Sequence, residues 1–205
     1  MLSLLANLFI ACNSYSRHKH TPILRLPNKS SYINLGITNN YEDKMNTKIS
    51  YFLASFLGVG YAPFAPGTIG SLATLPLAFV LAFMYGFSGI LIGVVISFFL
   101  GVAVIREVLK SSRHDPSFIV IDEVAGQLLS FVPVADFLQG NTASSAWLTY
   151  LLGFGLFRLF DITKPQPAKW ADTKLINAWG VMLDDIFAGV YAAVILYLQH
   201  RYLPF

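Results

Sequence analysis

The chain has 205 residues, of which 12% are charged and 55% are hydrophobic, and its mean hydropathy is +0.59. This composition excludes a disordered tail protein and a typical nucleic-acid-binding protein, because both carry far more charge. The length allows one domain or at most two. The single cysteine, Cys12, excludes an intrachain disulfide and a cysteine-rich metal site.

The positive charge of the chain is concentrated near its start. Residues 1–50 contain six Lys and Arg against two acids, whereas the rest contains eight bases and nine acids. A basic arm before an apolar body predicts attraction to anionic lipid on the cytoplasmic side of a membrane. Residues 1–44 are rich in Ser, Asn, Lys and His and match a signal peptide poorly. We therefore predict a disordered basic extension over 1–44 and a folded domain over 45–205, with Met45 as a candidate start of translation.

The body begins with a long uncharged run between Lys48 and Arg106. This run can hold two membrane spans of about 20 residues each. We predict spans at Thr68–Tyr85 and Ser88–Ile105, joined by a turn that begins at Gly86.

Further uncharged stretches follow at Phe137–Phe157 and Ile186–His200. Unpaired backbone groups are costly in lipid, so the spanning segments should be helical. The predicted fold class is all-α, a multi-helical integral membrane or deeply membrane-embedded domain.

Basic residues predict the topology. A hairpin places Lys48 on the same side of the membrane as a cluster after the second span, and the positive-inside tendency makes that side cytoplasmic. This cluster comprises Arg106, Lys110 and Arg113. We place a second cluster on the same side, formed by Arg158, Lys164, Lys169 and Lys174.

The first group of acids in the body contains Asp122 and Glu123. Asp115 followed by Pro116 is typical of a helix start, with Asp as N-cap and Pro in the first turn. A helix beginning there would place Asp122 and Glu123 two turns inside an apolar segment, where an unpaired carboxylate costs several kcal/mol. These two acids are therefore candidate ligands of a cation.

The second group combines acids with bases. Arg158 and Asp161 are three residues apart and share a helix face, so an ordinary surface ion pair is the alternative to a functional role. Pro165 disfavours helix at Lys164, which predicts that its ammonium lies at a helix end and reaches an anion. Asp172 follows a short proline-containing loop.

The third group is the adjacent pair Asp184 and Asp185, which we expect to open an apolar helix running to Leu198. Favourable contact with the helix dipole is one explanation of such a pair. No base lies nearby in sequence, however, and a cation would hold two such carboxylates at lower cost. A site made of carboxylates favours a hard ion, with Mg²⁺ before Mn²⁺ or Ca²⁺.

A glycine-rich segment precedes the first predicted span and ends in Gly67, Thr68, Gly70 and Ser71. It lacks the Gly-Lys-Ser/Thr ending of a P-loop. Thr68 is a candidate N-cap, and backbone amides from Gly67 to Gly70 are candidate phosphate donors. A simple loop-to-helix turn is the alternative interpretation.

Four segments together resemble the motifs of the phosphatidylglycerophosphatase A family, in the order and spacing of that family. They are Pro66–Ser71, Ile121–Gly126, Arg158–Pro165 and Met182–Gly189. The resemblance covers about residues 50–200. It implies a Mg²⁺-dependent lipid phosphatase of the bacterial inner membrane that converts phosphatidylglycerophosphate to phosphatidylglycerol, with 45–205 as its catalytic domain.

Chemistry assigns the individual roles. Asp122, Glu123, Asp184 and Asp185 are predicted to hold Mg²⁺, with Asp161 as a further ligand or a neighbour of one. Arg158 and Lys164 are predicted to bind the phosphate, together with the segment Gly67–Ser71. The attacking group is taken to be water, with Asp161 or Asp172 accepting its proton. An aspartyl-phosphate formed on Asp122 or Asp161 stays open as an alternative.

The expected partners are a phospholipid substrate and a membrane, with the site facing the cytoplasm, no nucleic acid and no obligate protein partner. Two other classes of protein compete with the phosphatase. A cation-coupled or proton-coupled transporter would also contain buried acids. Measuring both phosphate release and ion flux distinguishes a transporter from a phosphatase. A non-catalytic membrane scaffold would tolerate alanine at Asp184 and Asp185.

A chain that starts at Met45 is expected to insert into membranes and to keep most of the turnover of the full-length protein. The reason is that residues 1–44 are polar, basic and unlike the body in composition. Membrane fractionation and a turnover assay check this. Loss of insertion or of turnover in the shortened chain would contradict it.

Overall fold

The computed structural model describes residues 47–111 and 116–203. Residues 1–44 and Met45 lie outside the described residues, as do Arg113 and Asp115, so the extension stays a prediction. Every regular element in the described part is helical, which confirms the all-α class. After a helix over 47–54, the elements are η1 (Val59–Tyr61), α3 (Pro66–Ser111), α4 (Ile121–Phe131), η2 (Val132–Val134), α5 (Ala135–Leu138), α6 (Ser144–Thr163), α7 (Ala168–Lys174) and α8 (Ala178–Tyr202).

The predicted hairpin is present within α3. Gly86 has φ 54° and ψ −137°, which is not helical, and only glycine adopts such a conformation readily. The chain turns back there, since Gly89 packs against the backbone of Leu81. Asp136 Oδ1 accepts a hydrogen bond from the Phe87 amide at 3.3 Å and so holds the turn. Each arm is about 20 residues or more, roughly 30 Å, which is long enough to cross a bilayer.

Two helices, Pro66–Lys110 and Ala178–Tyr202, are long and apolar enough to span a membrane. The other predicted apolar stretch, Phe137–Phe157, is not one helix. It is interrupted after α5, where Gly140 has φ 67°, and α6 begins only at Ser144. The stretch Ile186–His200 lies within α8.

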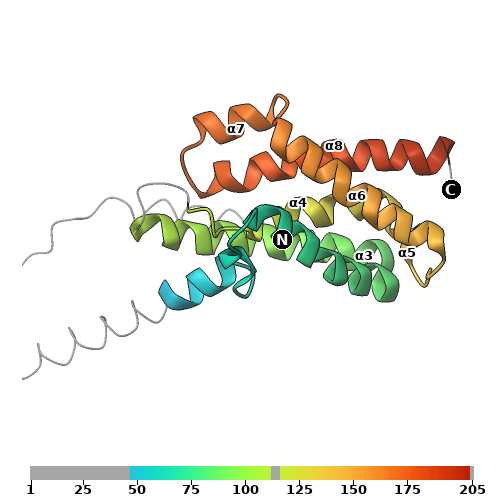
Figure 1. Ribbon diagram of the computed structural model, residues 1–205, viewed down its shortest axis with the longest axis horizontal. Coiled ribbons are helices and arrows are strands. Elements are labelled where there is room, and N and C mark those ends of the chain that lie inside the picture. The colour runs from blue at the N-terminus through green and yellow to red at the C-terminus, as the bar shows by residue number, and fades with distance from the viewer. Residues whose placement is uncertain (1–46, 112–115, 204–205) are drawn as a thin grey trace, which may run out of the picture. The chain divides into compact units, whose positions relative to one another are not determined.

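The short helix α4 lies at the centre of the bundle. It packs against α3 on one side and α8 on the other, with α6 beside α8 (Figure 1). Eight of its residues are buried, including Val124, Leu128 and Phe131. A buried central helix fixes the spacing of its neighbours, and Glu123 in its first turn contacts both the first turn of α3 and Arg158 of α6.

Glycines set the closest approach in the bundle. Gly126 of α4 faces the backbone of Asp185, and Gly189 of α8 faces the backbone of Gly126. A Cβ atom at either glycine would overlap the backbone of the opposite helix. The two helices can therefore cross in contact only because both positions lack a side chain.

Gly126→Ala is expected to push α4 away from α8 and to lower both thermal stability and turnover. The matched control is Gly155→Ala in α6, where a Cβ would meet nothing within 4 Å. The control should be neutral or stabilising by up to about 1 kcal/mol, because alanine favours helix. Thermal unfolding in detergent compares the two, and equal stability of both variants would contradict the close crossing.

Candidate active site

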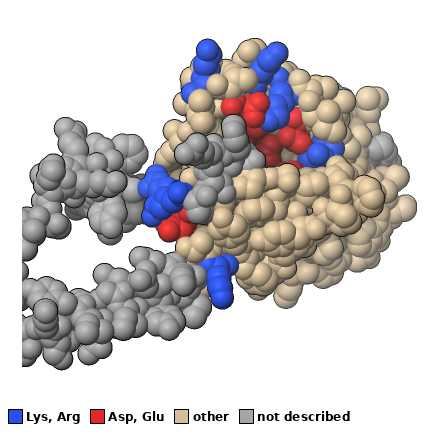
Figure 2. All heavy atoms as spheres, turned by 60° about the vertical axis from the view of Figure 1, so that its left-hand side comes forward, with Lys and Arg blue, Asp and Glu red and all other residues tan. Residues whose placement is uncertain are grey.

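The predicted charged residues come together near the starts of α3 and α4 and the end of α6, beside α7 and the first turns of α8. We call this group the polar site, and it comprises Ser71, Asp122, Glu123, Arg158, Asp161, Lys164, Asp172, Asp184 and Asp185. On the face shown in Figure 2, most of the visible acidic surface lies in one place next to basic side chains, and a smaller acidic patch lies beside basic atoms on the left. The polar site is thus the largest acidic group on this face of a mostly uncharged surface.

Arg158 connects three helices. Its Nη1 lies 2.7 Å from Asp161 Oδ2 and 3.4 Å from Glu123 Oε1, and it donates to Ser71 Oγ at 3.4 Å. The side chains of Arg158, Asp161 and Glu123 are each about 15% exposed or less. Arg158 and Asp161 therefore form an ion pair, but it belongs to a largely buried network and is not the ordinary surface pair given as the alternative to a functional role.

Lys164 makes the second connection. It is the C-cap residue of α6 with φ 40°, which confirms its predicted place at a helix end. Its Nζ donates to Asp172 Oδ1 and to Asp184 Oδ2, both at 2.8 Å. Burial lowers the pKa of the Lys164 ammonium, but these two hydrogen bonds outweigh burial and hold it above its ordinary value. Lys164 therefore stays charged and joins α7 to α8.

The start of α8 differs from the prediction. Asn177 is the N-cap and accepts hydrogen bonds from the amides of Trp179 and Gly180, so the helix begins at Ala178. Asp184 and Asp185 consequently lie about two turns inside it, 7% and 3% exposed. A dipole effect is confined to the first turn, and it does not explain these two acids.

The start of α4 is also different. The helix begins at Ile121, and residues 116–120 form a turn and a short irregular segment. The prediction that Asp122 and Glu123 lie two turns inside a helix from Pro116 is wrong, since both are in the first turn of α4. Negative charge is favourable there, although Glu123 is still largely buried.

Glu123 rests on the first turn of α3. A Cβ atom at Gly67 or Gly70 would overlap its carboxylate, so these glycines allow the carboxylate to approach the helix backbone. Thr68 is not the N-cap, because α3 begins at Pro66. Phosphate binding at the Gly67–Gly70 amides stays a prediction, and it would require Glu123 to move aside.

Carboxylates outnumber cations in the polar site, with six acids against Arg158 and Lys164. The charges of Asp122, Glu123, Asp161 and Asp184 all act on Asp185. Burial raises the pKa of Glu123 to about 8, although Arg158 opposes this shift. Glu123 Oε2 is buried with no hydrogen-bond partner among the described residues. The site by itself therefore repels anions, and binding a phosphate there requires added positive charge.

The donor set suits a hard divalent cation, but the described side chains do not form a ready-made cage. No three acidic, His or Cys side chains in the described ranges converge in a way that would hold a metal ion. Mg²⁺ is commonly bound by one or two carboxylates together with water and substrate phosphate. The unpartnered Glu123 Oε2 and the excess of carboxylates fit that type of site better than a closed one.

In metal-free protein, stability should fall as the pH rises from about 4.5 to about 8, because Glu123 binds a proton in the folded state that it releases on unfolding. Glu123→Gln mimics the protonated carboxyl, so its melting temperature should change less with pH than that of the wild type. The matched control is Glu107→Gln, which alters an acid paired with Lys110 outside the polar site. Thermal unfolding with a chelator present measures this, and equal pH slopes for all three proteins would contradict it.

Sequence reasoning found the charged residues but missed their partners. The contact between Arg158 and Glu123 joins residues on different helices, and no local spacing signals it. Gly189 and its contact with Gly126 were also missed, as was Asn177. For Asn177 the signal was available, since Asn is a preferred N-cap residue.

A sequence profile described as phosphatidylglycerophosphatase A matches residues 52–200. The chain is 34% identical to phosphatidylglycerophosphatase A of Haemophilus influenzae over 148 residues, which is 72% of this chain and 86% of that protein. It is 32% identical over 155 residues to phosphatidylglycerophosphatase A of Escherichia coli, covering 75% and 85% of the two chains. A putative phosphatidylinositol-3-phosphatase of Bacteroides thetaiotaomicron is 33% identical over 144 residues, covering 68% and 86%. No solved structure matches the chain.

Proposed function

The chain belongs to the phosphatidylglycerophosphatase A family, and we propose on this basis that it hydrolyses the terminal phosphate of phosphatidylglycerophosphate to give phosphatidylglycerol and inorganic phosphate. It is a hydrolase of phospholipid metabolism. The observation that carries this function is the placing of the charged family motifs in one polar site at the end of an apolar helical bundle. Such a site can meet the headgroup of a lipid whose chains stay in the membrane.

The protein is membrane-associated, and two of its helices are long and apolar enough to span a membrane. We propose the bacterial inner membrane, with the polar site on the cytoplasmic face. Arg106 and Lys110 lie in the last turns of α3. The hairpin brings these turns back to the end of the bundle where α3 begins, at Pro66. Arg106 and Lys110 of the first predicted basic cluster thus support this orientation, by the positive-inside tendency.

We propose Mg²⁺ as the cofactor, held by carboxylates from Asp122, Glu123, Asp184 and Asp185. When bound, it would supply positive charge to the phosphate oxygens and offset the excess of carboxylates. Arg158 and Lys164 would each exchange a carboxylate contact for a phosphate contact, which stabilises charge on the phosphate during hydrolysis.

Asp161 and Asp172 are the proposed acceptors of the proton of the attacking water. Each is already paired with a cation, Asp161 with Arg158 and Asp172 with Lys164. Movement of those cations towards the phosphate would free a carboxylate oxygen for the water. Asp161 is the more sheltered of the two, with a side chain 14% exposed against 43% for Asp172.

No observation supports the transporter alternative. The acids gather with Arg158 and Lys164 at one end of the bundle, whereas a transport site is expected near the middle of the spans.

The decisive experiment measures phosphate release by purified protein from phosphatidylglycerophosphate, with Mg²⁺ and with a chelator. Phosphatidylinositol 3-phosphate serves as the comparison substrate, because one relative bears the name of a phosphatase for that lipid. We expect Mg²⁺-dependent release from phosphatidylglycerophosphate at a higher kcat/KM. Faster release from phosphatidylinositol 3-phosphate would overturn the proposed substrate, and full activity in chelator would overturn the proposed cofactor.

A further inference from the structure

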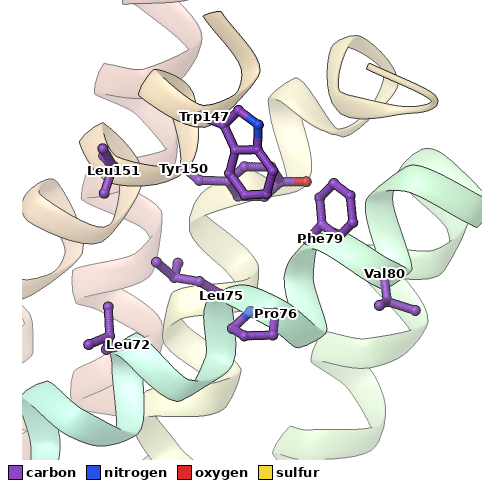
Figure 3. Close-up of a pocket in the computed structure, with 8 residues that line it drawn as sticks. All are labelled: Leu72, Leu75, Pro76, Phe79, Val80, Trp147, Tyr150 and Leu151. Atoms are coloured by element: carbon purple, nitrogen blue, oxygen red, sulfur yellow. The ribbon is translucent and has the colours of Figure 1, made fainter. Parts of the chain in front are cut away.

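An apolar groove runs between the first arm of α3 and α6. Its volume is about 540 Å³, within the range of small-molecule pockets. Figure 3 shows side chains of α3 along one wall and three side chains of α6 facing them. The lining residues are Leu72, Leu75, Pro76, Phe79, Val80, Trp147, Tyr150 and Leu151.

Packed aromatic rings make one end of the groove rigid. Phe79 stacks on Trp147 with ring centroids 5.2 Å apart and 17° between the planes. Tyr150 meets Phe79 edge-on at 6.2 Å and is only 3% exposed. Packed rings of this kind hold a wall in place, so the groove exists before anything enters it.

The groove lies next to the polar site along the same two helices. Leu72 directly follows Ser71, whose hydroxyl accepts from Arg158, and Leu75 lies one turn further along the same helix. On α6, Leu151 lies seven residues before Arg158, which is two turns along the same face. The same two helices therefore present charge at one end and a largely apolar groove next to it.

We propose that this groove binds an acyl chain of the phospholipid substrate. The inference rests on the proposed function, because it needs a ligand that is an anion at one end and hydrocarbon at the other. A phosphate bound near Arg158 would place the lipid glycerol beside Ser71 and Leu72, and a chain leaving that glycerol would follow Leu75 and Pro76 towards Phe79 and Val80. The chain would leave other hydrocarbon rather than water, so the added affinity would come from van der Waals contact with the side chains of the groove.

The position of Val80 provides a test based on chain length. Val80 lies nine residues beyond Ser71, about 14 Å along the helix axis. Val80→Trp should therefore block the far end of the groove and leave its start open. A dioleoyl substrate reaches this far end, whereas a dihexanoyl substrate with the same headgroup stops short of it. Val80 is 47% exposed, so the helix can carry a larger side chain there.

The experiment compares kcat/KM of purified protein on dioleoyl and dihexanoyl phosphatidylglycerophosphate in mixed micelles. In Val80→Trp, kcat/KM should fall roughly tenfold on the dioleoyl substrate and change little on the dihexanoyl substrate. Leu151 lies near the start of the groove, so Leu151→Trp should lower kcat/KM on both substrates. The matched control is Ile96→Trp on the second arm of α3. Ile96 is 60% exposed, close to the 59% of Leu151, and it does not line the groove.

Circular dichroism and gel filtration establish that each variant is folded, and Leu151→Trp tests the groove independently if Val80→Trp does not fold. The acyl-chain site would be overturned if both groove variants kept the wild-type ratio of kcat/KM on the two substrates and turned over as fast as Ile96→Trp. That result would leave the proposed phosphatase function intact. Absence of phosphate release by the wild type from either lipid would instead overturn the proposed function.

Discussion

Asparagine at Asp184 or at Asp185 is expected to lower phosphate release by about a hundredfold or more at low Mg²⁺. Both side chains are buried about two turns inside α8, and the carboxylates of Asp161 and Glu123 act on Asp185 from neighbouring helices. Asparagine keeps the shape and most of the hydrogen-bonding capacity but removes the charge that a cation needs. A helix-dipole role would cost about 1 kcal/mol or less and leave turnover in place.

The measurement is turnover as a function of Mg²⁺ concentration, in which remaining activity should require much more Mg²⁺. Asp136→Asn is the matched control, because Asp136 is an exposed acid at the hairpin end of the bundle and its Oδ1 acceptor is kept by asparagine. Near-normal activity of both Asp184→Asn and Asp185→Asn at low Mg²⁺ would remove the proposed metal site.

Arg158→Ala should lower turnover by a similar factor and also reduce stability. Its guanidinium is the shared partner of Glu123 and Asp161, and removing one member of a largely buried ion pair typically costs about 3–5 kcal/mol. Arg158→Lys should recover only part of the activity, because a single ammonium cannot reproduce the planar fork of the guanidinium.

Lys164→Ala is the comparison variant for Arg158→Ala. Its side chain is 31% exposed and its partner Asp172 is 43% exposed, so water can replace part of the lost contact. We expect lower turnover with a smaller loss of stability, and most Mg²⁺ binding retained in both alanine variants. Loss of Mg²⁺ affinity with unchanged turnover at saturating Mg²⁺ would show that these bases hold the cation site and do not bind phosphate.

The sequence by itself was sufficient for features that depend on local patterns. A charge-free run interrupted at Gly86 determined a helical hairpin, because bilayer thickness sets the length of a span and glycine permits the turn. Pro165 after Lys164 determined a helix end at that base. The scarcity of acids in the body also singled out the residues that gather in the polar site.

Helix starts were less well determined by sequence, because a local start signal can be overridden by packing or by a second signal. Asp115-Pro116 is a good start signal, yet α4 begins at Ile121, where the residues become buried against α3 and α8. Asn177 caps α8, so the helix begins at Ala178, ahead of Asp184. Asp184 and Asp185 are therefore buried residues inside the helix and not helix-end residues. Packing decided the first case and a side-chain cap decided the second.

Only the tertiary structure decided which charges meet. Arg158 contacts Glu123 from another helix, and Lys164 contacts Asp184 across the loop and α7. These pairings depend on the close crossing of α4 and α8 at Gly126 and on the contact of Glu123 with Gly67. Helical periodicity shows which face of a helix is apolar, but the distance between two helices follows from how their side chains pack, and that distance determines which carboxylate each base can reach.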